Sequence, residues 1–123
     1  MTSLPPLRDV IAAYGLSAKK TLGQNFILDT NLLDKIARAS KSRDPEPFER
    51  GTVIEVGPGP GGVTRAILNN GAKRLTVIEK DERCLGLLND IAAAYPDRLT
   101  ILNDDALGID AAALGASPRS VIS

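Results

Sequence analysis

The stretch Thr52-Val-Ile-Glu-Val-Gly-Pro-Gly-Pro-Gly-Gly62 decides the fold of this chain. The β-branched residues Val53, Ile54 and Val56 suit a covered strand. Four of the next six residues are glycines, which allow a sharp turn and leave room for a ligand because they have no Cβ. A helix is predicted over residues 63–70, with Gly71 as its C-terminal stop. A strand, a glycine-rich turn and a helix in this order are typical of the sites where nucleotide-like ligands bind.

The glycine spacing fits two ligand classes. The turn matches the dinucleotide pattern G-x-G-x-x-G, which is a weak signal by itself. It also matches the E-x-G-x-G-x-G pattern of S-adenosylmethionine (SAM) methyltransferases, through Glu55, Gly57, Gly59 and Gly61. Pro58 and Pro60 have no N–H to offer a pyrophosphate, whereas SAM carries no phosphate. The turn therefore favours SAM, with a dinucleotide or a tight turn without ligand as the alternatives.

The rest of the chain predicts a regular alternation of strands and helices. Further strands are predicted over residues 75–80, 99–102 and 119–123. Helices are predicted over residues 7–14, 31–40 and 81–95, and a polar linker over residues 41–51. In the helix over 81–95 the expected buried stripe is Leu85, Leu88, Ile91, Ala92 and Tyr95. This alternation predicts a parallel sheet with right-handed crossovers, in which the fourth strand lies beside the first.

Acidic residues follow the second and third predicted strands. Glu79 lies about 20 residues beyond Gly57, the spacing at which a carboxylate accepts hydrogen bonds from ribose hydroxyls. After the third strand, an acid within residues 103–105 is a candidate acceptor for an adenine amino group. The alternatives are an ordinary solvated acid for Glu79 and loop capping for residues 103–105.

Composition narrows the function classes. A length of 123 residues corresponds to one domain at most. The single cysteine, Cys84, excludes an internal disulfide and argues against a zinc site. The absence of histidine excludes histidine-based acid–base catalysis within this chain. No apolar run reaches the roughly 18 residues of a membrane span, and the N-terminus shows no secretory pattern, so we predict a cytoplasmic protein.

The net charge of the chain is zero, from 15 basic and 15 acidic residues. This balance is unlike the strongly basic footprint of many nucleic-acid-binding domains. Any binding to nucleic acid must therefore come from a local basic patch or from residues outside this chain.

Four segments together resemble one family, the ribosomal RNA adenine dimethyltransferases. Residues 19–29, KKTLGQNFILD, resemble its K-x-x-G-Q-N-F-L-x-D signature, and VIEVGPGPGGVTRAIL closely resembles its first SAM motif. Residues 77–79 and 103–107 resemble its second and third motifs. Gly23 and the prolines of the turn favour the bacterial small-subunit branch over the erythromycin-resistance branch.

The resemblance implies an α/β fold, namely a Rossmann-like SAM-dependent methyltransferase domain with helices flanking a parallel sheet. The implied activity is dimethylation of N6 of two adjacent adenines near the 3′ end of 16S rRNA, in the small ribosomal subunit. Carried over by position, Glu55 helps to hold the ammonium of SAM, Glu79 the ribose and Asp105 the adenine amino group. The other implied cofactor-binding residues are Gln24, Asn25, Ile27, Gly57 and Gly59. Ile27 stands where leucine is more usual, an apolar change that conserves volume.

The family's catalytic motif, Asn-Leu-Pro-Tyr or Asn-Leu-Pro-Phe, is expected just after Ser123. We therefore expect a fragment that is truncated after its fourth strand and holds no catalytic residue and no metal site. Residues 1–50 would form N-terminal helices and a segment covering the cofactor, and residues 51–123 the first half of the SAM-binding domain. Such a fragment is expected to be inactive alone, to bind no membrane and to self-associate. The alternatives are an NAD(P)-binding oxidoreductase domain and a non-catalytic ribosome-assembly module that binds RNA.

Overall fold

The computed structural model describes residues 4–6, 9, 30–105, 109 and 114–122. In these residues one four-stranded sheet has the strand order β3-β2-β1-β4, and all its strand pairs are parallel. The elements in chain order are α2 (Thr30–Arg43), α3 (Glu46–Arg50), β1 (Thr52–Val56), α4 (Gly62–Asn69), β2 (Leu75–Ile78), η1 (Glu82–Cys84), α5 (Leu85–Ala94), β3 (Leu99–Leu102) and β4 (Arg119–Ile122).

The predicted position of the fourth strand is confirmed, because β4 pairs with β1 rather than with β3. The sheet therefore reverses its direction of growth beside β1. In open α/β sheets, ligands bind at the carboxyl ends of the strands near such a reversal. This topology places the glycine-rich turn after β1 at the predicted binding edge.

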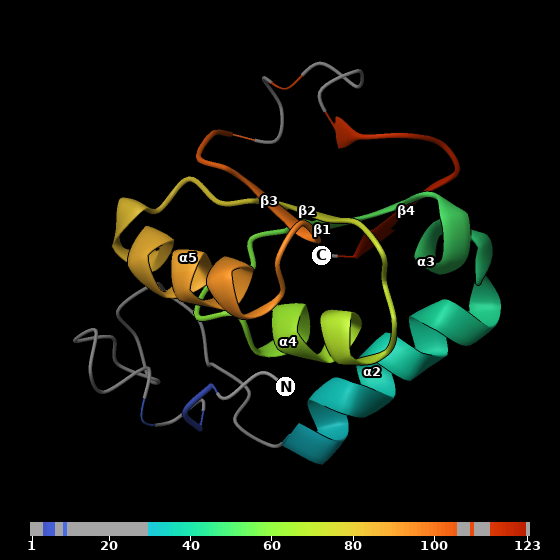
Figure 1. Ribbon diagram of the computed structural model, residues 1–123, viewed down its shortest axis with the longest axis horizontal. Helices are drawn as coiled ribbons and strands as arrows, with labels where there is room; N and C mark the ends of the chain where they lie inside the picture. Colours follow the sequence, from blue (N-terminus) through green and yellow to red (C-terminus); the bar gives the residue numbers. More distant parts are fainter. Residues whose placement is uncertain (1–3, 7–8, 10–29, 106–108, 110–113, 123) are drawn as a thin grey trace.

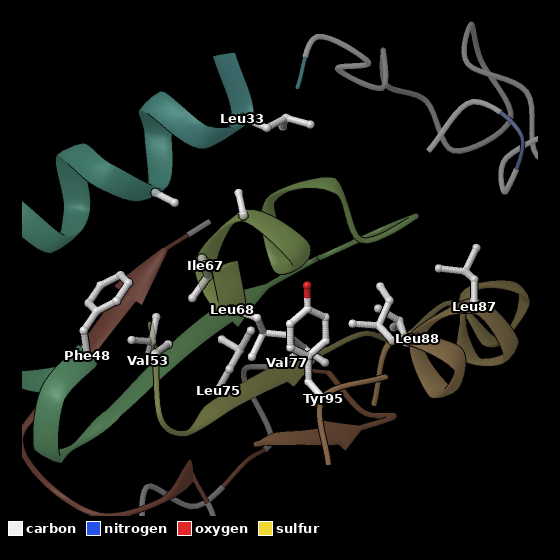
Figure 2. Packing of buried hydrophobic residues seen from close by; sticks show 14 of the residues in the cluster. Leu33, Phe48, Val53, Ile67, Leu68, Leu75, Val77, Leu87, Leu88 and Tyr95 are labelled. Carbon is white, nitrogen blue, oxygen red and sulfur yellow. The ribbon is translucent and has the colours of Figure 1, made fainter. Parts of the chain in front are cut away.

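The hydrophobic core lies between one face of the sheet and the helices. Figure 1 shows α4 and α5 below the sheet, with α2 packed against α4. Alternate residues of the central strands point into this core, among them Val53, Leu75 and Val77, each at most 1% exposed. They meet Leu68 of α4 and Leu88 of α5, as Figure 2 shows. Complete burial of one such side chain stabilises a fold by about 1.5–3 kcal/mol, so these contacts fix both helices on the sheet.

On the other face of the sheet, two threonine hydroxyls hold the segment that leads into β4. The Thr52 hydroxyl donates to the backbone oxygen of Ala116 at 2.9 Å, and the Thr76 hydroxyl donates to that of Leu114 at 2.8 Å. Gly115 lies between them with φ +118°, and a Cβ there would be 2.6 Å from Thr52 Oγ1. Residues 114–116 therefore pack closely against the sheet and direct the chain into β4.

The predicted polar linker over residues 41–51 is wrong. Helix α2 continues to Arg43, and Glu46–Arg50 form the short helix α3. The side chain of Phe48 is fully buried, and its backbone oxygen accepts a hydrogen bond from Lys73 N at 3.2 Å. These tertiary contacts stabilise a helix that the polar composition of the segment does not favour.

The predicted stripe of the helix over 81–95 is only partly correct. Asp81 caps the segment as expected, accepting a hydrogen bond from Arg83 N, but the first turn is the 3₁₀ helix η1. In α5 the buried residues include Leu87, whereas Leu85 is only partly buried. The tighter 3₁₀ turn changes the rotation of the helix relative to the α-helical spacing that we assumed.

Candidate cofactor-binding site

The candidate site is the turn between β1 and α4, together with the residues that follow β2 and β3. Gly57, Gly59 and Gly61 all have positive φ values, of 69°, 54° and 89°. Residues with a side chain rarely adopt this conformation, which explains why the turn is built from alternating glycines. The prolines between them fix φ at the intervening positions.

The backbone N–H groups of this turn are consumed within the protein. Gly57 N–H donates to Ile78 O at 2.9 Å, and Gly61 N–H donates to Pro58 O at 3.0 Å. Gly59 N–H donates to Glu79 Oε1 at 3.0 Å. The two prolines have no N–H. Each N–H of residues 57–61 therefore already has a partner inside the chain.

Two of the glycines have different surroundings. A Cβ added at Gly57 would meet no other atom within 4 Å, so this position faces open space. A Cβ at Gly61 would lie 2.4 Å from Ile91 Cδ1 in α5. Gly61 is therefore needed for the packing of α5 against the turn, whereas Gly57 leaves its space for a ligand.

Glu79 lies directly after β2, as predicted, and connects three neighbouring segments. Its side chain is 7% exposed, and its two carboxylate oxygens accept from Gly59 N and from Asp81 N at 3.0 and 2.9 Å. Its backbone N–H donates to Leu102 O at 2.9 Å, and its backbone oxygen accepts from Asn103 Nδ2 at 2.8 Å. Glu79 is thus held between the glycine turn, β2 and the end of β3.

Glu55 lies in β1 and its side chain is buried against α4, at 4% exposure. Its Oε1 atom accepts a hydrogen bond from the Thr64 hydroxyl. Burial, opposed by the hydrogen bond from Thr64 and assisted by the nearby Glu79 carboxylate, raises the pKa of Glu55 to about 7. Neither glutamate forms an ion pair with any residue that the structure describes. The site therefore places two buried acids near each other, and no cationic side chain among the described residues is paired with either.

The remaining predicted residues are placed less fully. Asp105 follows β3 in an exposed turn, where its backbone N–H donates to Asp104 Oδ1 at 2.7 Å. Gln24, Asn25 and Ile27 lie outside the described residues. The structure thus brings Glu55, Glu79 and the glycine turn together and leaves the contribution of residues 24–27 as a prediction.

Two contacts of the site were not foreseen from the sequence. Thr64 holds Glu55, and Asn103 holds the backbone of Glu79. The signal for Thr64 was its place in the first turn of the helix after the glycines, where its hydroxyl can reach back to the end of β1. Cys84 is buried, and burial raises the pKa of its thiol to about 11, which makes it a poor nucleophile at neutral pH.

The described part of the chain shows neither a metal-binding cluster nor a membrane-spanning helix. There, no group of three or more histidine, cysteine, aspartate or glutamate side chains is placed to hold a metal ion. Nor does any helix in those residues have the length and apolar character to cross a membrane.

Comparison with known proteins identifies consistent relatives. Residues 15–116 match the family model described as ribosomal RNA adenine dimethylase. Over 119 residues the chain is 57% identical to the ribosomal RNA small subunit methyltransferase A of Rhodospirillum rubrum, covering 97% of this chain and 40% of that protein. The protein of the same name from Rhizobium meliloti is 57% identical over 122 residues, which cover 99% of this chain and 43% of that protein. The chain thus spans about two fifths of the length of these relatives.

Solved structures agree on the fold. The 23S rRNA methyltransferase ErmE is 28% identical, with a TM-score of 0.57 over 70% of this chain and 32% of that chain. The magnesium protoporphyrin IX methyltransferase of Synechocystis PCC 6803, solved with bound SAM, has a TM-score of 0.54 over 88% of this chain and 58% of its own. At 16% identity this second likeness concerns the fold alone.

Proposed function

Because the chain belongs to the ribosomal RNA adenine dimethylase family, we propose that it forms the SAM-binding part of a 16S rRNA dimethyltransferase. Its substrate would be N6 of two adjacent adenines near the 3′ end of 16S rRNA, within the small ribosomal subunit. The relatives give no support to an NAD(P)-dependent oxidoreductase or to a non-catalytic assembly module. The cytoplasm, where ribosomal subunits mature, remains our prediction for its location.

The choice of SAM over a dinucleotide rests on one observation, namely that the N–H groups of the glycine turn already have hydrogen-bond acceptors within the chain. A dinucleotide pyrophosphate takes N–H donors from such a turn and from the start of the following helix, and the turn offers none, because each N–H of residues 57–61 is already bonded within the chain. The pyrophosphate would also lie near the buried acids Glu55 and Glu79, whose charge repels it. The ammonium and sulfonium of SAM carry positive charge, which complements the same two acids.

Each residue of the site then has a proposed role. Glu79 accepts hydrogen bonds from the ribose hydroxyls, and Glu55 balances the ammonium, directly or through water. Gly57 and Gly59 let the backbone approach the methionine part. Asp105 accepts from the adenine amino group, and residues Gln24, Asn25 and Ile27 line the pocket from the N-terminal segment.

When bound, SAM supplies an electrophilic methyl group on a sulfonium, which an adenine N6 takes by in-line displacement as the C–S bond breaks and N6 loses a proton. The described residues contribute by binding and orienting, because in-line transfer depends on the placement of the two reacting atoms. The rigid link between Glu79 and the glycine turn fixes two parts of the pocket relative to each other. A misplaced ribose would move the methyl group away from its acceptor.

The proposal is tested with tritiated SAM and small ribosomal subunits that lack this modification. The protein used is the complete natural gene product that contains residues 1–123. We expect label in two adjacent N6,N6-dimethyladenines of 16S rRNA, strong loss of label with Glu79→Ala, and no loss with Glu49→Gln, which changes an exposed acid of α3. Calorimetry adds a direct comparison of SAM with NAD. Absence of label in the rRNA, or binding of NAD but not of SAM, would refute the proposal.

A further inference from the structure

Basic residues gather at the amino ends of the strands, opposite the candidate cofactor site. Arg50 comes two residues before β1, Lys73 and Arg74 come directly before β2, and Arg119 is the first residue of β4. All four side chains are exposed. We call these four residues the amino-edge basic row.

The sheet brings the members of this row together although they are distant in sequence. Arg74 O accepts a hydrogen bond from Val53 N, and Thr52 pairs with Arg119 on the other side of β1. Arg74, directly before β2, and Arg119, in β4, therefore lie on opposite sides of β1, with backbones about 10 Å apart across the sheet, since neighbouring strands are about 4.8 Å apart. Lys73 N donates to Phe48 O of α3, the helix that ends with Arg50.

Most of the charge in this row is available to a partner. Within the described part of the chain, the side chains of Lys73 and Arg74 form no hydrogen bond and no ion pair. Arg119 Nε donates only to the backbone oxygen of Gly115, at 2.8 Å. Arg50 is paired with Glu46 at 2.9 Å, but both side chains are more than half exposed. Exposed pairs of this kind are weak, so a phosphate can compete for Arg50.

Arg98, which also comes directly before a strand, does not belong to the row. Its guanidinium donates to Leu68 O and Ala72 O and lies over the ring of Tyr95. It therefore closes the C-terminal end of α4 and is not offered to a partner.

The opposite edge of the sheet is acidic. The acids that end β1 or follow β2 and β3 are Glu55, Glu79, Asp81, Glu82, Asp104 and Asp105, and the only bases among residues 79–83 and 103–105 are Lys80 and Arg83. The chain is thus neutral as a whole, but positive charge gathers at the amino ends of the strands and negative charge at their carboxyl ends. A polyanion is repelled from the cofactor edge and attracted to the amino edge, about 15 Å away for strands of this length.

We propose that the amino-edge basic row binds the sugar-phosphate backbone of the RNA substrate, as a contact remote from the methyl-transfer site. This inference rests on the proposed function, which supplies the RNA. The row is expected to bind phosphate groups without regard to base sequence. It consists of lysine and arginine side chains and has no aromatic side chain for stacking bases and no helix for contacting base edges. It holds the RNA while the target bases reach the other edge.

The test uses the complete gene product and an RNA hairpin from the 3′ end of 16S rRNA. Lys73→Gln combined with Arg74→Gln removes the two charges of the row whose side chains form no hydrogen bond within the described residues. Lys35→Gln combined with Arg38→Gln removes the same charge from exposed positions of α2 and is the matched control. Binding is measured by fluorescence anisotropy over a range of salt concentrations, and SAM affinity is measured in parallel by calorimetry.

Each phosphate contact contributes about 0.7–0.9 to the slope of log affinity against log salt, so the first variant should lose about 1.5 from this slope. Its affinity for RNA near 0.1 M salt should fall by about tenfold or more. The control variant should keep the wild-type slope, and SAM affinity should be unchanged in both. Arg74→Lys, which keeps the charge, should retain the slope.

The outcomes separate this inference from the proposed function. An unchanged slope in the first variant, or an equal loss in the control, overturns the inference while methyl transfer to rRNA by the wild type still supports the enzyme. Loss of binding to whole small subunits with unchanged binding to the hairpin would also overturn it, because the partner would then be a ribosomal protein. No methyl transfer and no RNA binding by the wild type would refute both.

Discussion

Replacing Glu55 with glutamine tests the electrostatics of the site directly. In the folded protein the pKa of Glu55 is about 7, whereas in an unfolded chain it is near the ordinary value of 4.5. Between these values the folded state binds one proton more than the unfolded state. The stability of the ligand-free protein should therefore fall as the pH rises through this interval, since the unfolded state is favoured by proton release.

The size of the effect follows from the pKa difference. A shift from 4.5 to about 7, at about 1.36 kcal/mol for each unit, corresponds to about 3 kcal/mol. This loss is complete above the folded-state pKa and absent below the unfolded-state value. Glutamine has nearly the same shape, can accept from the Thr64 hydroxyl and does not titrate. Glu55→Gln should thus be more stable than the wild type by about 3 kcal/mol at mildly alkaline pH, and about equally stable near pH 4.

The assay is urea unfolding of the ligand-free protein, followed by circular dichroism at several pH values from about 4 to about 8. Glu49→Gln is the control, because it removes a carboxyl from an exposed position of α3. We expect the wild type and the control to show the same pH slope, and Glu55→Gln to lose the part between pH about 4.5 and about 7. If the stability of Glu55→Gln fell with pH between about 4.5 and about 7 as steeply as that of the wild type, the reasoning that burial of this acid destabilises the site would be refuted.

Three further predictions concern other parts of the site. Glu79→Ala removes the proposed charge-assisted hydrogen bond to the ribose, worth about 1.5–3 kcal/mol, so calorimetry should show a roughly 10- to 150-fold loss of SAM affinity, and wild-type affinity would reject the ribose role. Gly61→Ala should lower the melting temperature more than Gly57→Ala, because only the former collides with α5; equal melting temperatures would contradict the packing role. Thr64→Val removes the hydrogen bond that lowers the pKa of Glu55, so its stability should continue to fall at higher pH than that of the wild type.

The sheet and the glycine turn could be predicted because their sequence signals are local. Strand β1 is rich in β-branched residues, and the alternating glycines that follow all adopt positive φ. The place of β4 beside β1 followed from the topology of this fold class and is confirmed. The position of Glu79 at the end of β2 followed from its distance along the chain to the turn. Each of these features depends on a few neighbouring residues or on a general rule of topology.

Features that depend on contacts between distant segments were missed. The polar composition of helix α3 predicts a linker, yet its one large apolar residue, Phe48, is fully buried. Its prolines are compatible with a helix start, where the missing N–H has no helical partner to lose. The hydrogen bond from Thr64 to Glu55 could not be inferred with certainty from spacing, because it depends on the angle at which α4 leaves the turn.

The Glu79 side chain has two roles, since it holds the glycine turn and is proposed to contact the ribose. Removing it therefore affects the turn and the ribose contact together. A carboxylate has about four acceptor positions, and Glu79 uses two of them for Gly59 N and Asp81 N. The remaining positions are available for ribose hydroxyls without breaking the link to the turn. In our proposal the same side chain therefore shapes the turn before the ligand arrives and contacts the ligand afterwards. Because the turn begins where β1 ends, the bond from Gly59 N to Glu79 also brings the Glu79 carboxylate close to Glu55, near the end of β1. Burial of the Glu55 charge, together with the smaller repulsion from Glu79, lowers the stability of the ligand-free site, and a cationic ligand that balances this charge gains affinity.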